Sequence, residues 1–267
     1  MKDPLSLEQL NVVLKQAEIM IEWAVGTVYG KSFAETVKSG KGTDSSLLVD
    51  KRLLDRITRF LATKISRSSY SSLVREFAGE DSVQGDTVYM DPGEETEAFS
   101  QWLIFDIKLP GESQRLIDLF AKTELAKLPS DEQGLLKVRL ADRPSIYKVV
   151  KMGSAPKEQG TYLVQDLLSP DCVIRIQDKS TSLSLQRGSI FMGRAIPVVS
   201  SDSLFGVMGS IAEYPAKLWN FLSGPVDNWS KEYYKANPNS GSQDFFRSHH
   251  ARLRGEIRNI VVRHARY

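Results

Sequence analysis

The chain has 267 residues, of which 41% are hydrophobic and 25% charged, so it can hold one large domain or two ordinary ones. This composition excludes a disordered, collagen-like or coiled-coil chain. Its 35 basic and 33 acidic residues leave a formal charge of +2, which predicts no strong general attraction to nucleic acid or anionic membranes. The single cysteine, Cys172, excludes an internal disulfide and a cysteine-rich metal centre.

Neither an export signal nor a membrane segment is apparent in the sequence. The N-terminal residues MKDPLSLEQL lack the long apolar run of a secretory signal peptide. The most apolar stretch, residues 19–28, contains Glu22 and falls short of the ~20 residues that cross a bilayer. We therefore expect a cytoplasmic protein without membrane contact.

Apolar residues at helical spacing dominate the first part of the chain. A capping box formed by Ser6 and Gln9 precedes the first helix, and acids and turn formers follow the last one. In chain order, the sequence predicts a helix at residues 7–24, a connection at 31–50, helices at 50–66 and 70–77, and an acidic linker at 79–96.

The hydrophobic period changes from helical to alternating after Pro144. We expect helices before and after the alternating runs, at residues 97–105, 116–120, 130–140, 215–222 and 242–264. We expect short strands between them, at residues 146–150, 162–164, 172–176, 190–196 and 204–211. Because the connections are too short for parallel crossovers, these strands predict a small, partly open antiparallel barrel similar to an OB-fold.

Together these elements predict an α+β protein with four regions. A helical N-terminal region covers residues 1–78, and the acidic linker covers residues 79–96. Central helices that lead into a five-strand antiparallel barrel cover residues 97–214, and C-terminal helices with a basic tail cover residues 215–267.

The near-neutral total is a sum over segments of opposite charge. Residues 76–107 contain nine acidic residues and no basic one, whereas residues 247–267 contain six arginines and a single acid, Glu256. We expect the tail to form an amphipathic helix that docks an apolar stripe on the body and presents guanidinium groups, which suit bidentate contacts with phosphate or carboxylate. The candidate binding residues are Arg247, Arg252, Arg254, Arg258, Arg263 and Arg266. Their partner is either a polyanion or the chain's own residues 76–97.

A set of core and turn residues between positions 99 and 219 carries a family resemblance. The residues are Phe99, Trp102, Leu103, Phe105, Asp106, the run Ser145-Ile146-Tyr147-Lys148-Val149, Val164, Asp166, Leu167, Leu168, Leu185, Gly188, Arg194 and Pro197. In these positions the segment resembles an uncharacterised bacterial domain found in proteins with a C-terminal SEC-C zinc-binding motif. The cysteine-rich motif is absent from this chain, so the resemblance implies a fold and no zinc site.

Two short motifs imitate sites for phosphate chemistry. Residues 39–43, SGKGT, imitate a phosphate loop, but Glu35 and Gly42 stand where such a loop requires glycine and Ser/Thr, so we expect a surface loop. Asp171 and Asp178 imitate the carboxylates of a metal-dependent nuclease. Asp171 lies in a Ser-Pro-Asp sequence, where we expect it to begin a turn.

Histidine and cysteine give no clear catalytic centre. All three histidines, His249, His250 and His264, lie in the basic tail, where neighbouring arginines disfavour a bound cation. Cys172 precedes a strand pattern, which favours a buried, unreactive thiol. We therefore expect no cofactor and no metal site, and a non-catalytic role is favoured over an enzymatic one.

These observations predict a non-catalytic, regulatory adaptor of a bacterial assembly that binds a protein partner. Nucleic-acid binding is the alternative, through the basic tail and a barrel face on which Tyr147, Tyr162 and Phe191 stack with bases. A metal-dependent nuclease that uses Asp171 and Asp178 is the second alternative. The sequence leaves the oligomeric state open.

Overall fold

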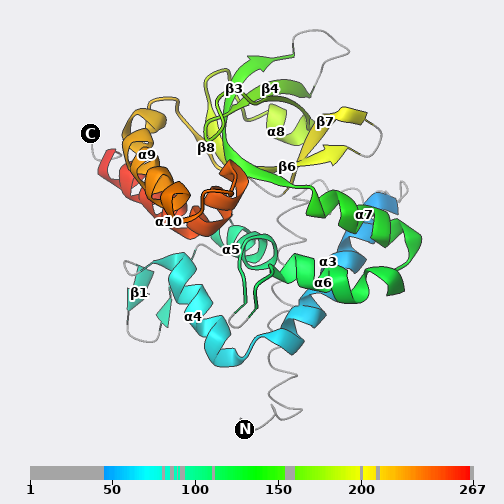
Figure 1. Ribbon diagram of the computed structural model, residues 1–267. Helices are drawn as coiled ribbons and strands as arrows, with labels where there is room; N and C mark the ends of the chain where they lie inside the picture. Colours follow the sequence, from blue (N-terminus) through cyan, green and yellow to red (C-terminus); the bar gives the residue numbers. More distant parts are fainter. Residues whose placement is uncertain are drawn as a thin grey trace. The chain divides into compact units, whose positions relative to one another are not determined.

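The computed structural model describes residues 45–79, 82–84, 87–88, 90, 94–109, 112–153, 160–198, 201–208 and 211–264 (Figure 1). The helix expected at residues 7–24 and most of the connection expected at 31–50 lie outside this set. The chain divides into two compact units, Met1–Leu140 and Ala141–Tyr267. The finer boundaries expected at residues 78, 96 and 214 stay predictions.

The described part of the first unit is mainly helical, as its sequence pattern predicts. The helices are α3 (Ser45–Lys64), α4 (Arg67–Ala78), α5 (Glu94–Phe105), α6 (Leu116–Glu124) and α7 (Ser130–Leu140), with a short 3-10 helix at Leu125–Lys127. Within the acidic segment, β1 (Val83–Gln84) pairs with β2 (Thr87–Val88). Ser66 caps α4 by accepting a hydrogen bond from the amide of Ser69 at 3.1 Å.

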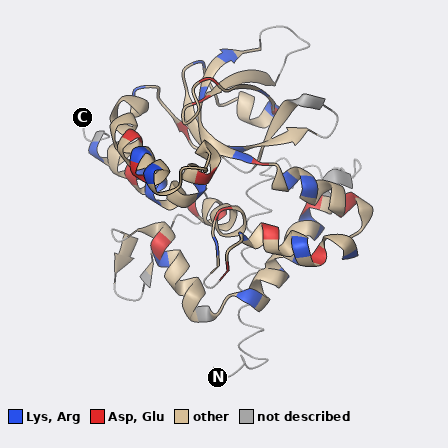
Figure 2. Cartoon of the chain, in the orientation of Figure 1, with Lys and Arg blue, Asp and Glu red and all other residues tan. Residues whose placement is uncertain are grey.

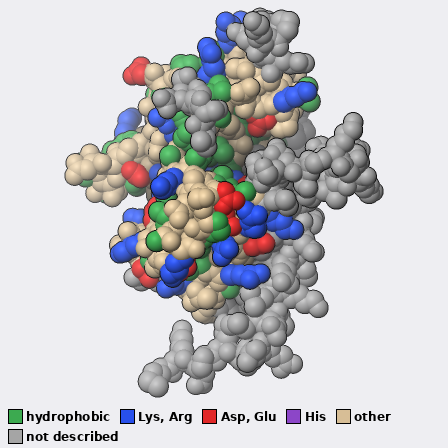
Figure 3. Space-filling model, turned by 90° about the vertical axis from the view of Figure 1, so that its right-hand side faces the viewer, with side chains coloured by type: hydrophobic (Ala, Val, Ile, Leu, Met, Phe, Trp, Pro, Cys, Tyr) green, Lys and Arg blue, Asp and Glu red, His purple; other side chains and the backbone are tan. Residues whose placement is uncertain are grey.

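Ion pairs in which one or both partners are buried join α3 to α7 in this unit. The Glu132 side chain is fully buried, and its carboxylate lies 3.1 Å from Arg52 Nε and 2.8 Å from Arg56 Nε. Arg139 Nη2 lies 2.6 Å from an oxygen of Asp50. Figure 3 shows one face of the molecule, on which basic and acidic side chains lie next to one another.

The second unit contains a closed barrel of five strands. They are β3 (Arg143–Met152), β4 (Thr161–Asp166), β5 (Val173–Gln177), β6 (Ile190–Val198) and β7 (Ser201–Met208), in the order β3-β4-β5-β7-β6 with β6 returning to β3. A further short strand, β8 (Glu213–Tyr214), pairs with β6. The α+β class and the small barrel are confirmed.

The sequence predicts a partly open, antiparallel barrel, whereas the observed barrel is closed and mixed. Strand β5 runs parallel to β7, with Arg175 opposite Leu204 and Ile176 opposite Phe205, whereas the other pairs are antiparallel. Strand direction cannot alternate completely around a closed ring with an odd number of strands. Closure of five strands therefore requires a parallel pair.

Alternating residues of the strands fill the barrel. The interior cluster consists of Tyr147, Val149, Tyr162, Val164, Ile174, Ile176, Leu185, Phe191, Ala195 and Phe205. The short helix α8 (Lys179–Ser182) lies beside β4, where the hydroxyl groups of Tyr162 and Thr181 are 2.6 Å apart. Asp178 caps α8, because its Oδ1 accepts hydrogen bonds from the amides of Ser180 and Thr181 at 2.9 and 3.1 Å.

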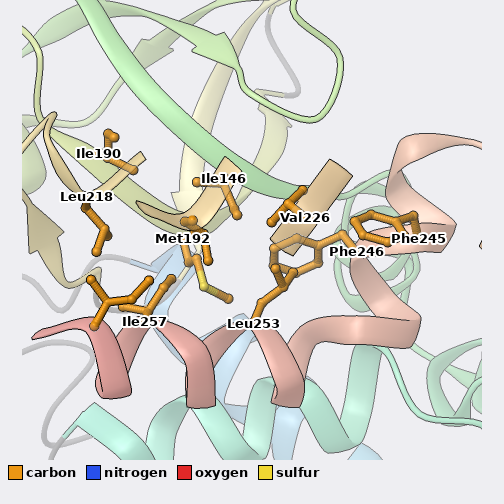
Figure 4. Packing of buried hydrophobic residues seen from close by; sticks show 11 residues of the cluster. Ile146, Ile190, Met192, Leu218, Val226, Phe245, Phe246, Leu253 and Ile257 are labelled. Carbon is orange, nitrogen blue, oxygen red and sulfur yellow. The ribbon is translucent and has the colours of Figure 1, made fainter. Parts of the chain in front are cut away.

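Two long helices cover the outer side of β3 and β6 (Figures 1 and 4). They are α9 (Leu218–Ala236) and α10 (Ser242–His264), and α9 continues well past the predicted end at residue 222, through Pro225. Figure 4 shows barrel residues facing helix residues in one cluster, which comprises Ile146, Ile190, Met192, Leu218, Leu222, Val226, Phe245, Phe246, Leu253, Ile257 and Ile260. Burial of each such side chain contributes roughly 1.5–3 kcal/mol to the stability of the folded state. The predicted apolar stripe of the tail is thus part of the core.

Candidate interaction surface

The first of the predicted tail residues, Arg247, lies in a buried ion-pair network. Asp142 is fully buried, and its Oδ2 accepts a hydrogen bond from Arg194 Nη1 at 2.5 Å. Its Oδ1 accepts a second bond from Arg247 Nη2 at 2.8 Å. Arg247 is only 12% exposed in its side chain. This arginine therefore connects α10 to the start of β3, a role that the sequence does not indicate.

The other tail arginines occupy several environments. The guanidinium of Arg252 lies over the ring of Trp229, 4.0 Å from its centroid. Arg263 lies 3.7 Å from Glu256, and its side chain is exposed. Arg254 and Arg258 are half-buried, and Arg266 lies outside the described residues. Blue positions recur along α10 in Figure 2, but α10 also carries acidic positions.

The three aromatic residues predicted to stack with bases lie inside the barrel instead. Tyr147 and Tyr162 are each 1% exposed, and Phe191 is fully buried. The hydroxyl of Tyr147 donates a hydrogen bond to the carbonyl of Arg143 at 2.5 Å. Burial raises the pKa of both tyrosines above its ordinary value. None of the three presents a ring face to solvent, so the stacking role is corrected to a core role.

A different aromatic group lies at the surface between α9 and α10. We call it the aromatic cluster, and it consists of Trp229, Tyr233, Tyr234, Phe245, His249 and Arg252. Trp229 and Tyr233 are one turn apart on α9, and Phe245, His249 and Arg252 follow one another at turn spacing on α10. Phe245 is buried and forms the base of the group, whereas Arg252 is exposed and the other four residues are half-buried.

His249 is the centre of this cluster. Its ring stacks on Phe245 with centroids 4.5 Å apart, and it meets Tyr233 edge to face at 5.6 Å. Its Nδ1 lies 3.1 Å from the carbonyl of Phe245. Burial lowers the pKa of His249, and the charge of Arg252 lowers it further, against the opposing effects of the Phe245 carbonyl and Glu232. The neutral ring is therefore favoured.

The residues considered for metal chemistry lie apart. His250 is buried and packs on Phe246, while His249 belongs to the aromatic cluster. Asp178 is occupied as the cap of α8, and Asp171 is exposed in a turn. Across the described ranges, no group of three or more His, Cys, Asp or Glu residues is arranged to hold a metal ion.

Cys172 is only half-buried, so the expectation of a buried thiol is corrected. Its sulfur lies 4.0 Å from Arg143 Nη1. It stands just before β5, at the end of a turn, and packs against the interior cluster of the barrel while staying partly exposed.

The sequence also carries a signal for the aromatic cluster. Trp229, Tyr233 and Tyr234 have the spacing of a helix face, but Gly224-Pro225 indicates a helix end and leaves them outside the predicted elements. In the structure Pro225 lies within α9. The loss of one backbone donor is tolerated there, and the helix carries its aromatic residues to α10.

Comparison with known proteins gives the chain a family but no individual relative. Searches of curated proteins and of solved structures find no match. In the part of the chain that the structure describes, no helix is long and apolar enough to span a membrane. The sequence model of a family of unknown function, DUF7986, matches residues 56–246, which is more than half of the chain. The expected link to SEC-C proteins stays a prediction. The chain belongs to the family of unknown function DUF7986.

Proposed function

We propose that the protein is a non-catalytic adaptor that binds a protein partner through the aromatic cluster of α9 and α10. The observation that carries this proposal is the stacked Arg252–Trp229 pair, with its 4.0 Å separation, beside the half-buried Tyr233 and Tyr234. Tryptophan, tyrosine and arginine are the residues that contribute most often to the affinity of protein interfaces. A regulatory role in a bacterial assembly is part of the same proposal.

The geometry of the cluster suits an interface. Phe245 and the buried helix–barrel core fix its base, so the half-buried aromatic side chains are held in place before a partner arrives. Aromatic side chains of this kind bury a large area at a low cost in conformational entropy. Arg252 adds a charge at the rim, where it favours one orientation of the partner.

Nucleic-acid binding through α10 receives less support. Arg247 is committed to Asp142, and the aromatic residues expected to stack with bases are inside the barrel. The nuclease alternative receives little support, because Asp178 caps α8. Pairing of the basic tail with residues 76–97 stays a prediction.

Affinity purification from native cells tests the adaptor proposal. The tagged full chain is compared with Trp229→Ala and Arg252→Glu, with Arg263→Ala as the control on the same helix outside the cluster. We expect a defined protein partner whose recovery falls about tenfold or more with either cluster variant and stays unchanged with the control. Circular dichroism of each variant verifies folding. Equal recovery by the wild type and both cluster variants would refute the proposal.

A further inference from the structure

A second surface, on the opposite side of the barrel wall from its core, also has the character of a binding site. The strands β3, β4 and β5 turn Tyr147, Val149, Tyr162, Val164, Ile174 and Ile176 inward. The alternating residues therefore point outward. On β3 and β6 the outward residues Ile146, Ile190 and Met192 are covered by α9 and α10. Farther along the sheet, the outward residues Lys151, Val173 and Arg175 are exposed, and Leu163 and Leu204 are half-buried.

Basic and aliphatic residues alternate on this uncovered surface. Strand register places Lys151 opposite Leu163, Leu163 opposite Arg175, and Arg175 opposite Leu204. The neighbouring row contains Lys148, Gln165 and Val173. We call the six residues Lys148, Lys151, Leu163, Val173, Arg175 and Leu204 the basic face. Figure 2 shows basic positions on these strands.

The cations of the basic face are Lys148, Lys151 and Arg175. No side-chain ion pair or hydrogen bond engages Lys148, Lys151 or Arg175 within the described ranges. The strand residues at the outward positions of β3, β4 and β5 include no Asp or Glu. Asp166, at the end of β4, accepts hydrogen bonds from the Ser145 hydroxyl and from the amides of Leu168 and Ser169. Positive charge is thus in excess on the outward side of β3, β4 and β5, whereas β7 carries one acid, Asp202, two residues before Leu204.

We infer that the basic face binds an acidic protein segment with interspersed apolar side chains. The inference adds a second contact to the proposed adaptor function and rests on it. Neighbouring strands lie about 4.8 Å apart, so Lys151 and Arg175, two strands apart, have backbones about 10 Å apart and flank Leu163. Carboxylates two residues apart in an extended segment are separated by about 7 Å, within reach of both flexible cationic side chains.

The same surface fits a protein segment better than a nucleic acid. Single-stranded nucleic acids bind where aromatic rings stack with bases, and β3, β4 and β5 turn no aromatic ring outward at their described positions. Leu163, Val173 and Leu204 instead supply aliphatic contacts. Such contacts suit apolar side chains of a peptide.

A random peptide display library tests the inference with the full chain as bait. We expect enriched peptides to combine Asp or Glu with Leu, Ile or Val. The charge-reversed variant Lys151→Glu/Arg175→Glu removes two exposed cations, and its matched control is Lys217→Glu/Lys231→Glu, which changes two exposed lysines of the same unit outside the basic face. Fluorescence anisotropy then measures the affinity of the best peptide and of a 20-nucleotide single-stranded DNA.

The expected result is affinity for the acidic peptide that falls about tenfold in the charge-reversed variant and steeply with salt, and stays within about twofold in the control. Trp229→Ala should leave peptide affinity unchanged, so failure of this site and failure of the aromatic cluster are distinguishable. Enrichment without acidic residues, equal peptide affinity in the charge-reversed variant, or binding of the DNA but no acidic peptide would each overturn the inference.

Discussion

Removing the charge of Asp142 should strongly destabilise the second unit. The fully buried carboxylate accepts bonds from Arg194, which is 1% exposed, and from Arg247, which is 12% exposed. In Asp142→Asn both guanidinium groups keep their charge but lose the Asp142 carboxylate, while Arg247 keeps its 3.7 Å contact with Asp244. Hydrogen bonds to charged groups contribute about 1.5–3 kcal/mol each, and breaking a buried ion pair from one side costs about 3–5 kcal/mol. We expect a loss of about 3–5 kcal/mol.

Hydrogen exchange read by mass spectrometry localises this loss to the second unit. Peptides from β3, β6 and α10 should exchange about 10²–10⁴-fold faster in Asp142→Asn, because each 1.36 kcal/mol corresponds to a factor of ten. The control is Asp171→Asn, which alters an exposed carboxylate and should leave exchange nearly unchanged. Replacing all three network residues by apolar ones should restore most of the protection. An exchange rate in Asp142→Asn within threefold of the wild type would refute the reasoning.

Two further predictions concern pH and backbone geometry. Because the pKa of His249 is lowered in the folded state, stability should fall as pH drops through the ordinary value of 6.5 toward the folded-state pKa, and His249→Gln should remove this loss in thermal melts. An identical pH profile in His249→Gln would contradict this. Gly160 and Gly188 both have positive φ, so alanine is strained at either position. At Gly160 the new Cβ would also lie 3.1 Å from Lys179 Cα. Gly160→Ala should therefore lower the free energy of unfolding, measured by urea denaturation, by at least ~1 kcal/mol more than Gly188→Ala. Equal losses would show that this close contact relaxes.

The described helices and strands follow closely from local sequence patterns. Alternation after Pro144 predicts the strands because each buries one side in the barrel, and the strand at residues 204–211 corresponds to β7. Alternation does not tell which side faces inward. On β3, Ile146 and Tyr147 point to opposite sides and both are buried, one under the helices and one in the barrel. The placement of Tyr147 at a binding surface failed for this reason.

Long-range pairing accounts for what the sequence did not reveal about the candidate sites. Arg247 appears in the sequence as one of six tail arginines, but its partner Asp142 lies 105 residues earlier. The aromatic cluster forms only when α9 and α10 pack together. In the sequence, Pro225 favours a helix end, although α9 continues through it. The separation of acidic and basic segments can be read from the sequence. Which of their side chains lie in the core and which at the surface depends on the folded structure.

The mixed strand order also determines how the barrel is assembled. Strands β3, β4 and β5 are sequential antiparallel neighbours, and β6 and β7 form a separate hairpin. Joining the two pieces requires the β3–β6 and β5–β7 pairings, which connect residues distant along the chain. The entropy cost of closing these loops comes before the stabilisation that the contacts provide. These pairings should therefore form late and limit the folding rate. Residues 178–189 connect β5 to β6. The length of this connection sets the effective concentration of the β6–β7 hairpin near strands β3–β5.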